Sequence, residues 1–364
     1  MILEPASYEE AGELLKASAE VARAVRPVGG GTKLGWGGPT RADLDVSTAS
    51  LSAICEHNAG DLTAVLEAGA RLGHVQDVFA EAGQMLALDP PLGADDAATI
   101  GGIVAAGDSG PLRHRYGAPR DLVIGITVAL SDGTVAKSGG KVIKNVAGYD
   151  LGKLFSGSFG TLGLIVGVAV RLHPRPATRA TALFRSDAPD ALARTAAALA
   201  HAPLELEALD VRWEHGRGAV LARAAGAAAL GRAESMVERW GGEVIEADDA
   251  LWASQRAGQR SQDGIVLRVS ALPARLGRLL EVADRTGARL VGRAGLGVAW
   301  ATLPDVAALN EVRREFGGVV LDRPPGVELE AWEHEPPAAT LMRRVKERFD
   351  PAGILNPGVF AGGI

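Results

Sequence analysis

Residues 27–33 of the chain are Pro27-Val28-Gly29-Gly30-Gly31-Thr32-Lys33, with three successive glycines directly after a short apolar run. Glycine adopts positive φ without a steric cost, so successive backbone N–H groups can turn toward one anion. Two similar strings follow apolar runs further along the chain: Thr99-Ile100-Gly101-Gly102 and Gly157-Ser158-Phe159-Gly160-Thr161-Leu162-Gly163. A single glycine string is most often a surface turn, but three at the ends of strand-like runs indicate a site for one large phosphate-bearing cofactor.

The glycine pattern argues against the simplest nucleotide-binding motifs. No Gly-x-Gly-x-x-Gly follows the first apolar run, and no Gly-Lys-Ser/Thr closes a P-loop. Leu34 stands where a P-loop would place its magnesium-binding hydroxyl group. A nucleoside triphosphatase is therefore not expected.

Length and composition set the outer bounds. The 364 residues suit two or three domains, since a domain has roughly 100 to 200 residues. The net charge of −6 gives no broad attraction for nucleic acid or acidic lipid. A single cysteine, Cys55, cannot form an internal disulfide, which favours a reducing cytosol. No signal peptide is visible, and the longest strongly apolar stretch, residues 162–170, is shorter than the roughly 20 residues that span a bilayer. We expect a cytoplasmic protein that reaches a membrane only through partners.

Periodicity predicts two small α/β units in the first half of the chain. Ser7-Tyr8-Glu9-Glu10 is a capping box that opens a helix. Asp150 is expected to cap the helix that follows it. Short strands are predicted at residues 25–28 and 45–47, and a second unit is predicted from strands at 62–67, 123–130, 134–137 and 164–172 with a helix from residue 72 to about 82.

The sequence changes character after His173-Pro174-Arg175-Pro176. Two prolines around an arginine predict a linker, and alanine-rich helical patterns alternate with short strands beyond it. Residues 176–335 are therefore expected to form a smaller α+β domain with an antiparallel sheet and helices. A helix at 341–349 and a rigid turn, Asp350 to Gly358, end the chain.

Several strings together resemble one family. The chain resembles the FAD-binding domain of the vanillyl-alcohol oxidase/p-cresol methylhydroxylase (PCMH-type) family, and within it the GlcE-type subunits of glycolate oxidase. The resemblance is dense up to about residue 175 and sparse from there to the terminal Asp350-Pro351 and Asn356-Pro357-Gly358. Besides the glycine strings, it depends on Ala82-Gly83-Gln84-Met85-Leu86, Asp89-Pro90-Pro91, Arg120-Asp121-Leu122-Val123-Ile124-Gly125 and Gly140-Lys141-Val142-Ile143-Lys144-Asn145-Val146-Ala147-Gly148-Tyr149-Asp150-Leu151.

The resemblance implies an α+β fold with a PCMH-type FAD-binding domain at 1–175, made of two α/β subdomains at about 1–50 and 51–175. Residues 176–335 would be a smaller cap domain, and residues 336–364 would return to the FAD domain. In the family the first glycine string wraps the FAD pyrophosphate, the second region follows the ribityl chain and flavin, and the third meets the adenosine half. The implied cofactor-binding residues are Val28, Gly29, Gly30, Gly31, Thr32, Lys33, Pro90, Pro91, Thr99, Gly101, Gly102, Ala105, Ser109, Gly160, Thr161, Gly163 and Ile165.

The attachment of the cofactor can also be predicted. Many family members bind the flavin covalently through a histidine just after the first glycine string. Here Lys33, Leu34 and Trp36 occupy that neighbourhood. The chain is therefore expected to bind FAD non-covalently.

The second half lacks a metal motif. Stand-alone 2-hydroxyacid dehydrogenases of the family carry Gly-His-x-Gly-Asp-Gly-Asn-x-His, whose two histidines bind a divalent metal. In Gly292-Arg293-Ala294-Gly295-Leu296-Gly297-Val298-Ala299-Trp300 the glycine frame is kept, but both histidines, the aspartate and the asparagine are replaced. Arg293 and Trp300 cannot bind such a cation. No metal site is expected.

Candidate catalytic residues are few. Lys144 is equally well read as a positive charge beside the flavin or as a solvated lysine. Arg293 could hold a substrate carboxylate in an enzyme that works alone. His114, between Arg113 and Arg115, could act as an acid or base, although a charged surface loop is the simpler interpretation. No catalytic base can be named.

The resemblance implies an FAD-binding subunit of a glycolate oxidase or dehydrogenase complex, with a paralogous catalytic FAD subunit and an iron–sulfur subunit as partners. Such a complex oxidises glycolate, a small 2-hydroxy acid, to glyoxylate and passes the electrons onward through flavin. Two alternatives stay open. One is a stand-alone FAD-dependent 2-hydroxyacid or alcohol dehydrogenase, and the other is a non-catalytic scaffold subunit.

Overall fold

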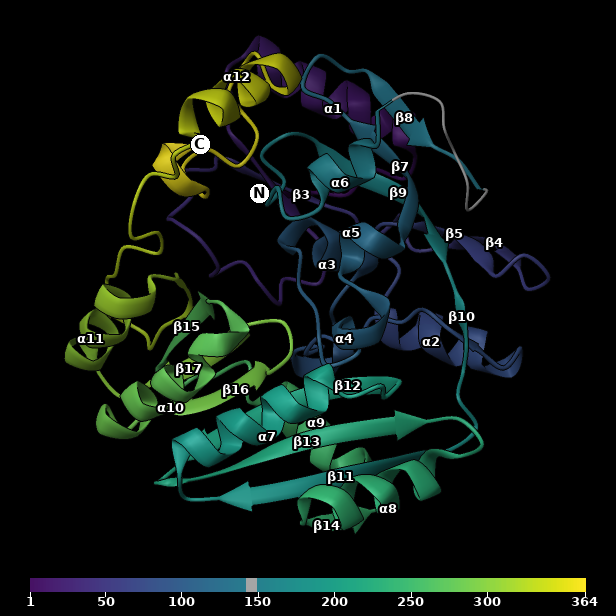
Figure 1. The fold of residues 1–364 in the computed structure, drawn as a ribbon. Helices are drawn as coiled ribbons and strands as arrows, with labels where there is room; N and C mark the ends of the chain where they lie inside the picture. Colours follow the sequence, from purple (N-terminus) through teal and green to yellow (C-terminus); the bar gives the residue numbers. More distant parts are fainter. Residues whose placement is uncertain (142–148) are drawn as a thin grey trace. The chain divides into compact units, whose positions relative to one another are not determined.

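The computed structural model describes residues 1–141 and 149–364, and the chain divides into two compact units. The first unit consists of Met1–Ser109, Tyr116–Arg175 and His334–Ile364. The second consists of Gly110–Arg115 and Pro176–Glu333. Each unit has its own sheets and its own buried core (Figure 1).

The first unit begins with a small parallel sheet of order β1-β3-β2, formed by β1 (Ile2–Leu3), β2 (Val25–Val28) and β3 (Leu44–Ser47). Helix α1 (Tyr8–Glu20) packs its apolar side into the core beside these strands. The Ser7 half of the predicted capping box is confirmed at its start, whereas Glu10 reaches back to Ala6 N rather than to the N-cap amide. Ser7 Oγ accepts a hydrogen bond from Glu10 N at 3.0 Å, and the Glu10 carboxylate accepts one from Ala6 N at 2.8 Å.

A five-stranded antiparallel sheet of order β4-β5-β9-β7-β8 forms the rest of this unit's framework. β9 (Leu164–Arg171) is its central strand and is buried from Leu164 to Val170, which explains its uninterrupted apolar sequence. The predicted strands of this region are confirmed to within about two residues. The other elements are β4 (Ile54–Asn58), β5 (Thr63–Glu67), β6 (Gln84–Met85), β7 (Val123–Ala129), β8 (Val135–Gly139) and β10 (His173–Pro174), with α2 (Leu72–Glu81), α3 (Ile100–Ala106), α5 (Pro119–Leu122) and α6 (Leu151–Phe155). Helix α4 (Arg113–Tyr116) belongs to the second unit except for Tyr116.

One predicted cap is wrong. Asp150 occupies the N-cap position of α6, but its side chain makes no capping hydrogen bond. Its carboxylate instead lies 3.0 Å from Lys153 Nζ. An ion pair one turn along the helix has therefore taken the place of the cap.

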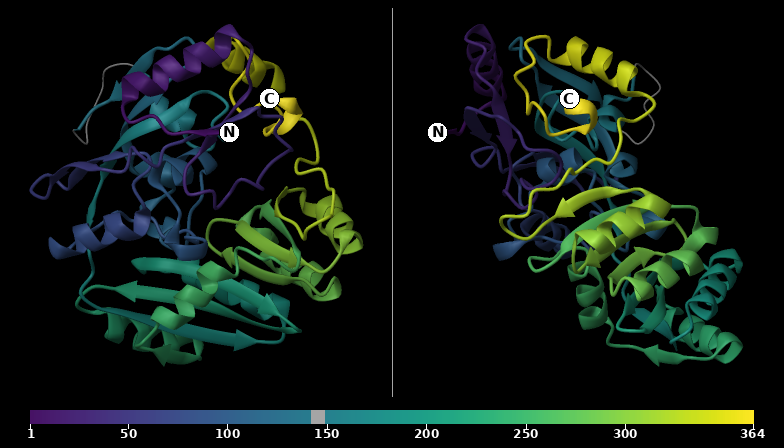
Figure 2. Two further views of the ribbon diagram at one scale, coloured as in Figure 1. Left: turned by 180° about the vertical axis from the view of Figure 1, so that it is seen from behind. Right: turned by 90° about the vertical axis from the view of Figure 1, so that its left-hand side faces the viewer.

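The end of the chain lies against the start of the same unit. After α12 (Ala339–Phe349), Ile354 O accepts a hydrogen bond from Val25 N at 2.8 Å, and Asn356 N donates one to Val25 O at 2.7 Å. The C-terminal residues thus continue the small parallel sheet beyond β2. Both ends of the chain therefore belong to the first unit (Figure 2).

The second unit is an eight-stranded sheet of order β14-β11-β13-β12-β16-β17-β15-β18, in which every neighbouring pair is antiparallel. The expected class, α+β with an antiparallel sheet and helices, is confirmed. Its strands are β11 (Arg179–Ser186), β12 (Leu206–Glu214), β13 (Arg217–Ala225), β14 (Glu243–Ile245), β15 (Ile265–Ser270), β16 (Arg289–Arg293), β17 (Val298–Leu303) and β18 (Val319–Asp322), and its helices are α7 (Pro189–His201), α8 (Ala229–Trp240), α9 (Asp249–Ala257), α10 (Leu276–Arg285) and α11 (Val306–Phe316).

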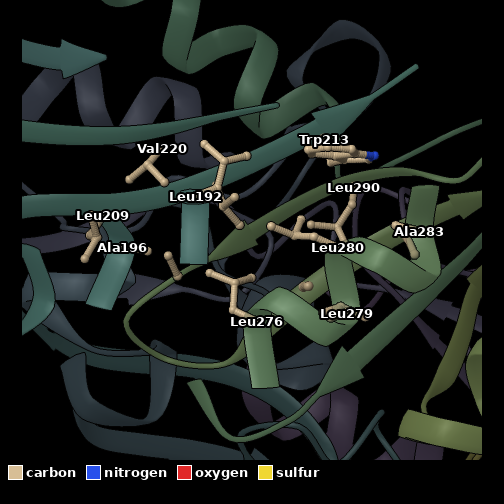
Figure 3. Packing of buried hydrophobic residues seen from close by; sticks show 14 of the residues in the cluster. Leu192, Ala196, Leu209, Trp213, Val220, Leu276, Leu279, Leu280, Ala283 and Leu290 are labelled. Carbon is tan, nitrogen blue, oxygen red and sulfur yellow. The ribbon is translucent and has the colours of Figure 1, made fainter. Parts of the chain in front are cut away.

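Helices cover both faces of this sheet. On one face, Leu192 of α7 and Leu280 of α10 pack against Leu209 and Trp213 of β12 (Figure 3). On the other face, Trp252 of α9 belongs to a separate cluster with residues of β11, β12 and β13. The sheet is therefore a buried layer, and polar side chains on its α9 face are shielded from water.

Candidate cofactor site

A cleft of about 620 Å³, including the space open to solvent, lies within the first unit. The first two glycine strings reach it together, the first from the end of β2 and the second from the start of α3. The third string contributes Phe159, and the C-terminal segment contributes Asn356 and Val359. The remaining lining residues are Arg26, Pro27, Gly29, Gly30, Gly31, Thr32, Lys33, Leu34, Trp36, Thr40, Thr99, Gly102, Ala105 and Ala106.

Close backbone packing explains the glycines of the first string. A Cβ at Gly30 would lie 1.5 Å from Ala97 O, and one at Gly29 would lie 2.2 Å from Thr99 Oγ1. Gly31 has a φ of 72°, which favours glycine. The string is held directly against the loop that leads into α3, and any side chain at Gly29 or Gly30 would separate the two.

The first string also presents unused donors. Among the described residues, the backbone N–H groups of Gly29, Gly30 and Gly31 make no hydrogen bond to another group of the chain. Gly30 and Gly31 are exposed. Successive free amides on a glycine turn can bind an anion such as a phosphate group.

The cationic side chains of the cleft already have carboxylate partners. Lys33 Nζ lies 3.3 Å from the buried Asp108 carboxylate. Arg26 donates two hydrogen bonds to Asp45, at 2.7 and 2.9 Å, which hold the pKa of that carboxyl below its usual value. With both cations paired, the backbone amides are the main feature of the cleft that would attract phosphate.

The C-terminal segment closes one side of the cleft. Gly38 N donates to Val359 O at 2.8 Å, and Thr40 Oγ1 donates to Pro357 O at 3.2 Å. From the same segment, Asn356 Nδ2 donates to Phe159 O at 2.7 Å. Residues separated by most of the chain therefore complete one wall.

The structure brings only part of the predicted set to this cleft. Gly29, Gly30, Gly31, Thr32, Lys33, Thr99, Gly102 and Ala105 line it. The others do not: a Cβ at Gly101 would meet Ala68 in the core, and Ile165 on β9 is 5% exposed. The predicted residues outside the lining are Val28, Pro90, Pro91, Gly101, Ser109, Gly160, Thr161, Gly163 and Ile165. Their contact with a cofactor stays a prediction.

Sequence reasoning missed several lining residues. Phe159 lies inside a string that had been recognised, and Asn356 lies in a recognised terminal motif without an assigned role. Their positions in the string and the motif could have suggested them. Trp36 lies in the stretch after the first glycine string where relatives attach the flavin, so its position also gave a signal. No local signal identifies Val359, because only the fold brings this residue to the cleft.

The two catalytic candidates differ in what the structure shows. Lys144 lies outside the described residues. Arg293 is fully buried on β16 of the second unit, with Nη1 2.5 Å from Asp210 Oδ2, and it also donates to Gln259. Its guanidinium lies over the Trp300 ring, 4.8 Å from the centroid. In this arrangement Arg293 binds a carboxylate of its own chain rather than facing solvent.

The glycine frame around Arg293 has a structural explanation. The segment forms the β16–β17 hairpin, and a Cβ at Gly297 would lie 1.8 Å from Ala271 O. A Cβ at Gly295 would lie 3.2 Å from Cε1 of His114, whose pKa is lowered by burial. Within the part of the chain that the structure describes, no cluster of His, Cys, Asp or Glu could hold a metal ion.

Comparison with known proteins defines the class. Residues 1–139 match the model of an FAD-binding domain, and residues 329–360 match the C-terminal domain of FAD-linked oxidases. The glycolate oxidase subunit GlcE of Escherichia coli is 30% identical over 320 residues, which cover 84% of this chain and 83% of that protein. The chain therefore belongs to the family of PCMH-type FAD-linked oxidoreductases, as its glycine strings predicted.

Other relatives match over shorter stretches. The glycolate oxidase subunit GlcD of Bacillus subtilis is 34% identical over 57% of this chain, and a mitochondrial cytochrome D-lactate dehydrogenase of Saccharomyces cerevisiae is 33% identical over 58%. The chain spans 45% and 36% of the lengths of these two proteins. A solved alkyldihydroxyacetonephosphate synthase shares the fold with a TM-score of 0.70 at 16% identity, over 98% of this chain and 75% of that one.

The geometry of the cleft fits the FAD that the family implies. Glycine amides without a hydrogen-bond partner match a pyrophosphate, and the cleft beside them is open to solvent. The seven histidines all lie in the described part of the chain, and none of them lines the cleft. Among the described residues, no helix is long and apolar enough to cross a membrane.

Proposed function

We propose that the chain is the FAD-binding subunit of a glycolate oxidase or dehydrogenase complex. The observation that carries this proposal is the similarity to the GlcE subunit, which extends over most of both chains. The GlcD match suggests a paralogous FAD subunit as a partner, and an iron–sulfur subunit would complete the complex. The complex would convert glycolate to glyoxylate.

The cleft in the first unit would hold FAD without a covalent bond. Gly29, Gly30 and Gly31 would bind the pyrophosphate through backbone N–H groups, while Thr99 and Ala105 would lie along the cofactor. When bound, the flavin supplies a two-electron acceptor for a CH–OH group. The chain's own contribution is to bind and orient this cofactor on bare backbone.

The second unit favours a subunit over an enzyme that works alone. Arg293 and Trp300 stand where metal-dependent relatives would have histidines, and Arg293 is buried against Asp210. A cation built into the chain thus replaces an exchangeable metal that could bind a hydroxy acid. The exposed single cysteine, Cys55, is consistent with a reducing cytoplasm.

The test is co-expression with the paralogous FAD subunit and the iron–sulfur subunit, followed by purification through a tag on this chain. The expected product contains all three chains, flavin and iron, and reduces a dye when glycolate is added. The chain purified alone should be yellow, but its flavin should not bleach with glycolate or D-lactate. Bleaching by the isolated chain would establish a stand-alone dehydrogenase, and a colourless chain in an active complex would establish a scaffold.

A further inference from the structure

We propose that Asn356 is a cofactor-binding residue whose side-chain oxygen accepts a hydrogen bond from a sugar hydroxyl group of FAD. This inference rests on the proposed function, because it takes the cleft in the first unit as the FAD site. It assigns a role to the terminal Asn356-Pro357-Gly358 motif, which had none.

The orientation of the Asn356 amide is fixed by its neighbour. Asn356 Nδ2 donates to Phe159 O at 2.7 Å, and a carbonyl oxygen can only accept, so the nitrogen must face Phe159. The other amide atom, Oδ1, is buried and has no hydrogen-bond partner among the described residues. Asn356 is one of the residues that line the cleft, and it is only 8% exposed. A buried acceptor without a partner costs about 1–3 kcal/mol, so a ligand group that donates to it is favoured.

The backbone holds Asn356 in place from several directions. Its φ of 46° lies in the left-handed region, which asparagine tolerates better than most residues. Asn356 N donates to Val25 O at 2.7 Å, so the residue is attached to the strand that leads into the first glycine string. On its C-terminal side, Pro357 O accepts from Thr40 Oγ1.

A largely shielded lysine, Lys346, fixes the residues around it. Lys346 Nζ donates to Leu355 O at 2.7 Å, to Thr161 O at 2.8 Å and to the Asp350 carboxylate at 2.6 Å. Leu355 precedes Asn356, and Thr161 belongs to the third glycine string. The amide is thus held in position before any ligand arrives, which lowers the entropic cost of binding.

The chemistry of Oδ1 selects the part of FAD that it would contact. An amide oxygen only accepts, whereas phosphate oxygens also accept, so Asn356 is unsuited to the pyrophosphate. Sugar hydroxyl groups donate, and FAD has them in its ribose and in its ribityl chain. The cleft therefore provides donors at Gly29, Gly30 and Gly31 for phosphate and an acceptor at Asn356 for a hydroxyl.

The first experiment uses Asn356→Gly, because glycine accepts the backbone conformation and removes only the side chain. Affinities of the flavin-free wild-type chain and the variant are measured for FAD, ADP and FMN. We expect about a tenfold loss of FAD affinity, corresponding to one lost hydrogen bond. ADP and FMN represent the two halves of FAD. If the ribose donates the hydrogen bond, the variant should lose the same affinity for ADP and bind FMN as the wild-type chain does. If the ribityl chain donates it, the affinity for FMN should fall and that for ADP should be unchanged.

Several outcomes would overturn the inference. Unchanged FAD affinity in the variant would remove the role of Asn356 while leaving the proposed function intact. Equal losses for ADP and FMN would show that the side chain only shapes the cleft. A wild-type chain that binds no FAD would instead refute the proposed function.

A second measurement requires no variant and stays informative if Asn356→Gly does not fold. The wild-type chain is titrated with ADP against 2′,3′-dideoxy-ADP, and with riboflavin against lumiflavin, which lacks the ribityl chain. Within one of the two pairs, the ligand that has the hydroxyl groups should bind about tenfold more tightly than the ligand that lacks them. Equal affinities within both pairs would contradict the inference.

Discussion

Arg293 and Asp210 lie directly opposite each other on β16 and β12, with Nη1 and Oδ2 2.5 Å apart and both side chains fully buried. Gln255 Nε2 of α9 also donates to Asp210 Oδ2, at 3.0 Å. The pair lies on the sheet face that α9 covers, away from the large apolar cluster. A guanidinium that seemed available for a substrate carboxylate from the sequence is therefore bound by a carboxylate of its own chain.

Removing either partner of this pair should destabilise the protein strongly. Asp210→Leu leaves an uncompensated buried cation, and Arg293→Met leaves an uncompensated buried carboxylate, so each is expected to lower the free energy of unfolding by about 3–5 kcal/mol. The free energy of unfolding should fall less in the double variant than in either single variant, because the double variant leaves no buried charge unpaired. Urea unfolding of the three variants measures this, and additive losses in the double variant would rule out the coupling.

The stability of the second unit should depend on pH through Asp210. Burial raises the pKa of this carboxyl from 3.8 to about 6, although Arg293 acts in the opposite direction. Between about pH 4 and pH 6 the folded chain then keeps a proton that the unfolded chain releases, so stability from this group falls as pH rises through that window and is constant above it.

Asp210→Asn removes this titration, so the variant is the reference. The free energy of unfolding of the wild-type chain, minus that of Asp210→Asn, should decrease between pH 4 and pH 6, because other carboxyl groups cancel in the difference. Urea unfolding at several pH values provides the profile. If the free energies of unfolding of the wild-type chain and of Asp210→Asn change in parallel with pH, Asp210 does not titrate in this window.

The first glycine string allows a matched comparison. In Gly30→Ala the new methyl group would meet Ala97 O, whereas a Cβ at Gly35 has nothing within 4 Å. We expect Gly30→Ala to displace the loop and to lower flavin occupancy severalfold, and Gly35→Ala to bind flavin like the wild-type chain. Absorbance near 450 nm per polypeptide measures occupancy, and full occupancy in Gly30→Ala would contradict the packing argument.

Filling the cleft should block the cofactor without breaking the fold. Ala105 lines the cleft from α3, and its backbone oxygen accepts from Phe159 N at 2.8 Å, a bond that the substitution retains. Ala105→Phe is expected to abolish flavin binding while the far-ultraviolet circular dichroism stays unchanged. Ala198→Phe, on the exposed side of α7, is the control and should bind flavin normally. A yellow Ala105→Phe protein would place the cofactor elsewhere.

Acid denaturation should release the flavin. Of the described residues that could attach flavin covalently, none of the seven histidines lines the cleft, and the single cysteine, Cys55, lies on β4 outside it. After precipitation with trichloroacetic acid, the yellow colour is expected in the supernatant. Flavin that stays with the pellet would demonstrate a covalent bond and refute this expectation.

Local patterns predicted much of the first unit correctly. The cap at Ser7 and the apolar run of β9 depend on neighbouring residues, so short windows of sequence were sufficient. Asp150 was placed at a helix start correctly, but its side chain chose Lys153 over the backbone. A surface ion pair and a helix cap each stabilise a protein by about 1 kcal/mol or less, so a sequence pattern does not show which of the two will form.

The sequence by itself determined the cofactor family, because successive glycines at strand ends leave backbone amides without side chains to cover them, and this pattern is local in the sequence. Only the tertiary structure decided that Asn356 joins Phe159 in one wall and that Arg293 is bound to Asp210. These partners are separated by 197 and 83 positions along the chain. Burial and hydrogen bonding between such distant residues arise from strand order, and strand order is set by packing of the whole unit rather than by any local stretch.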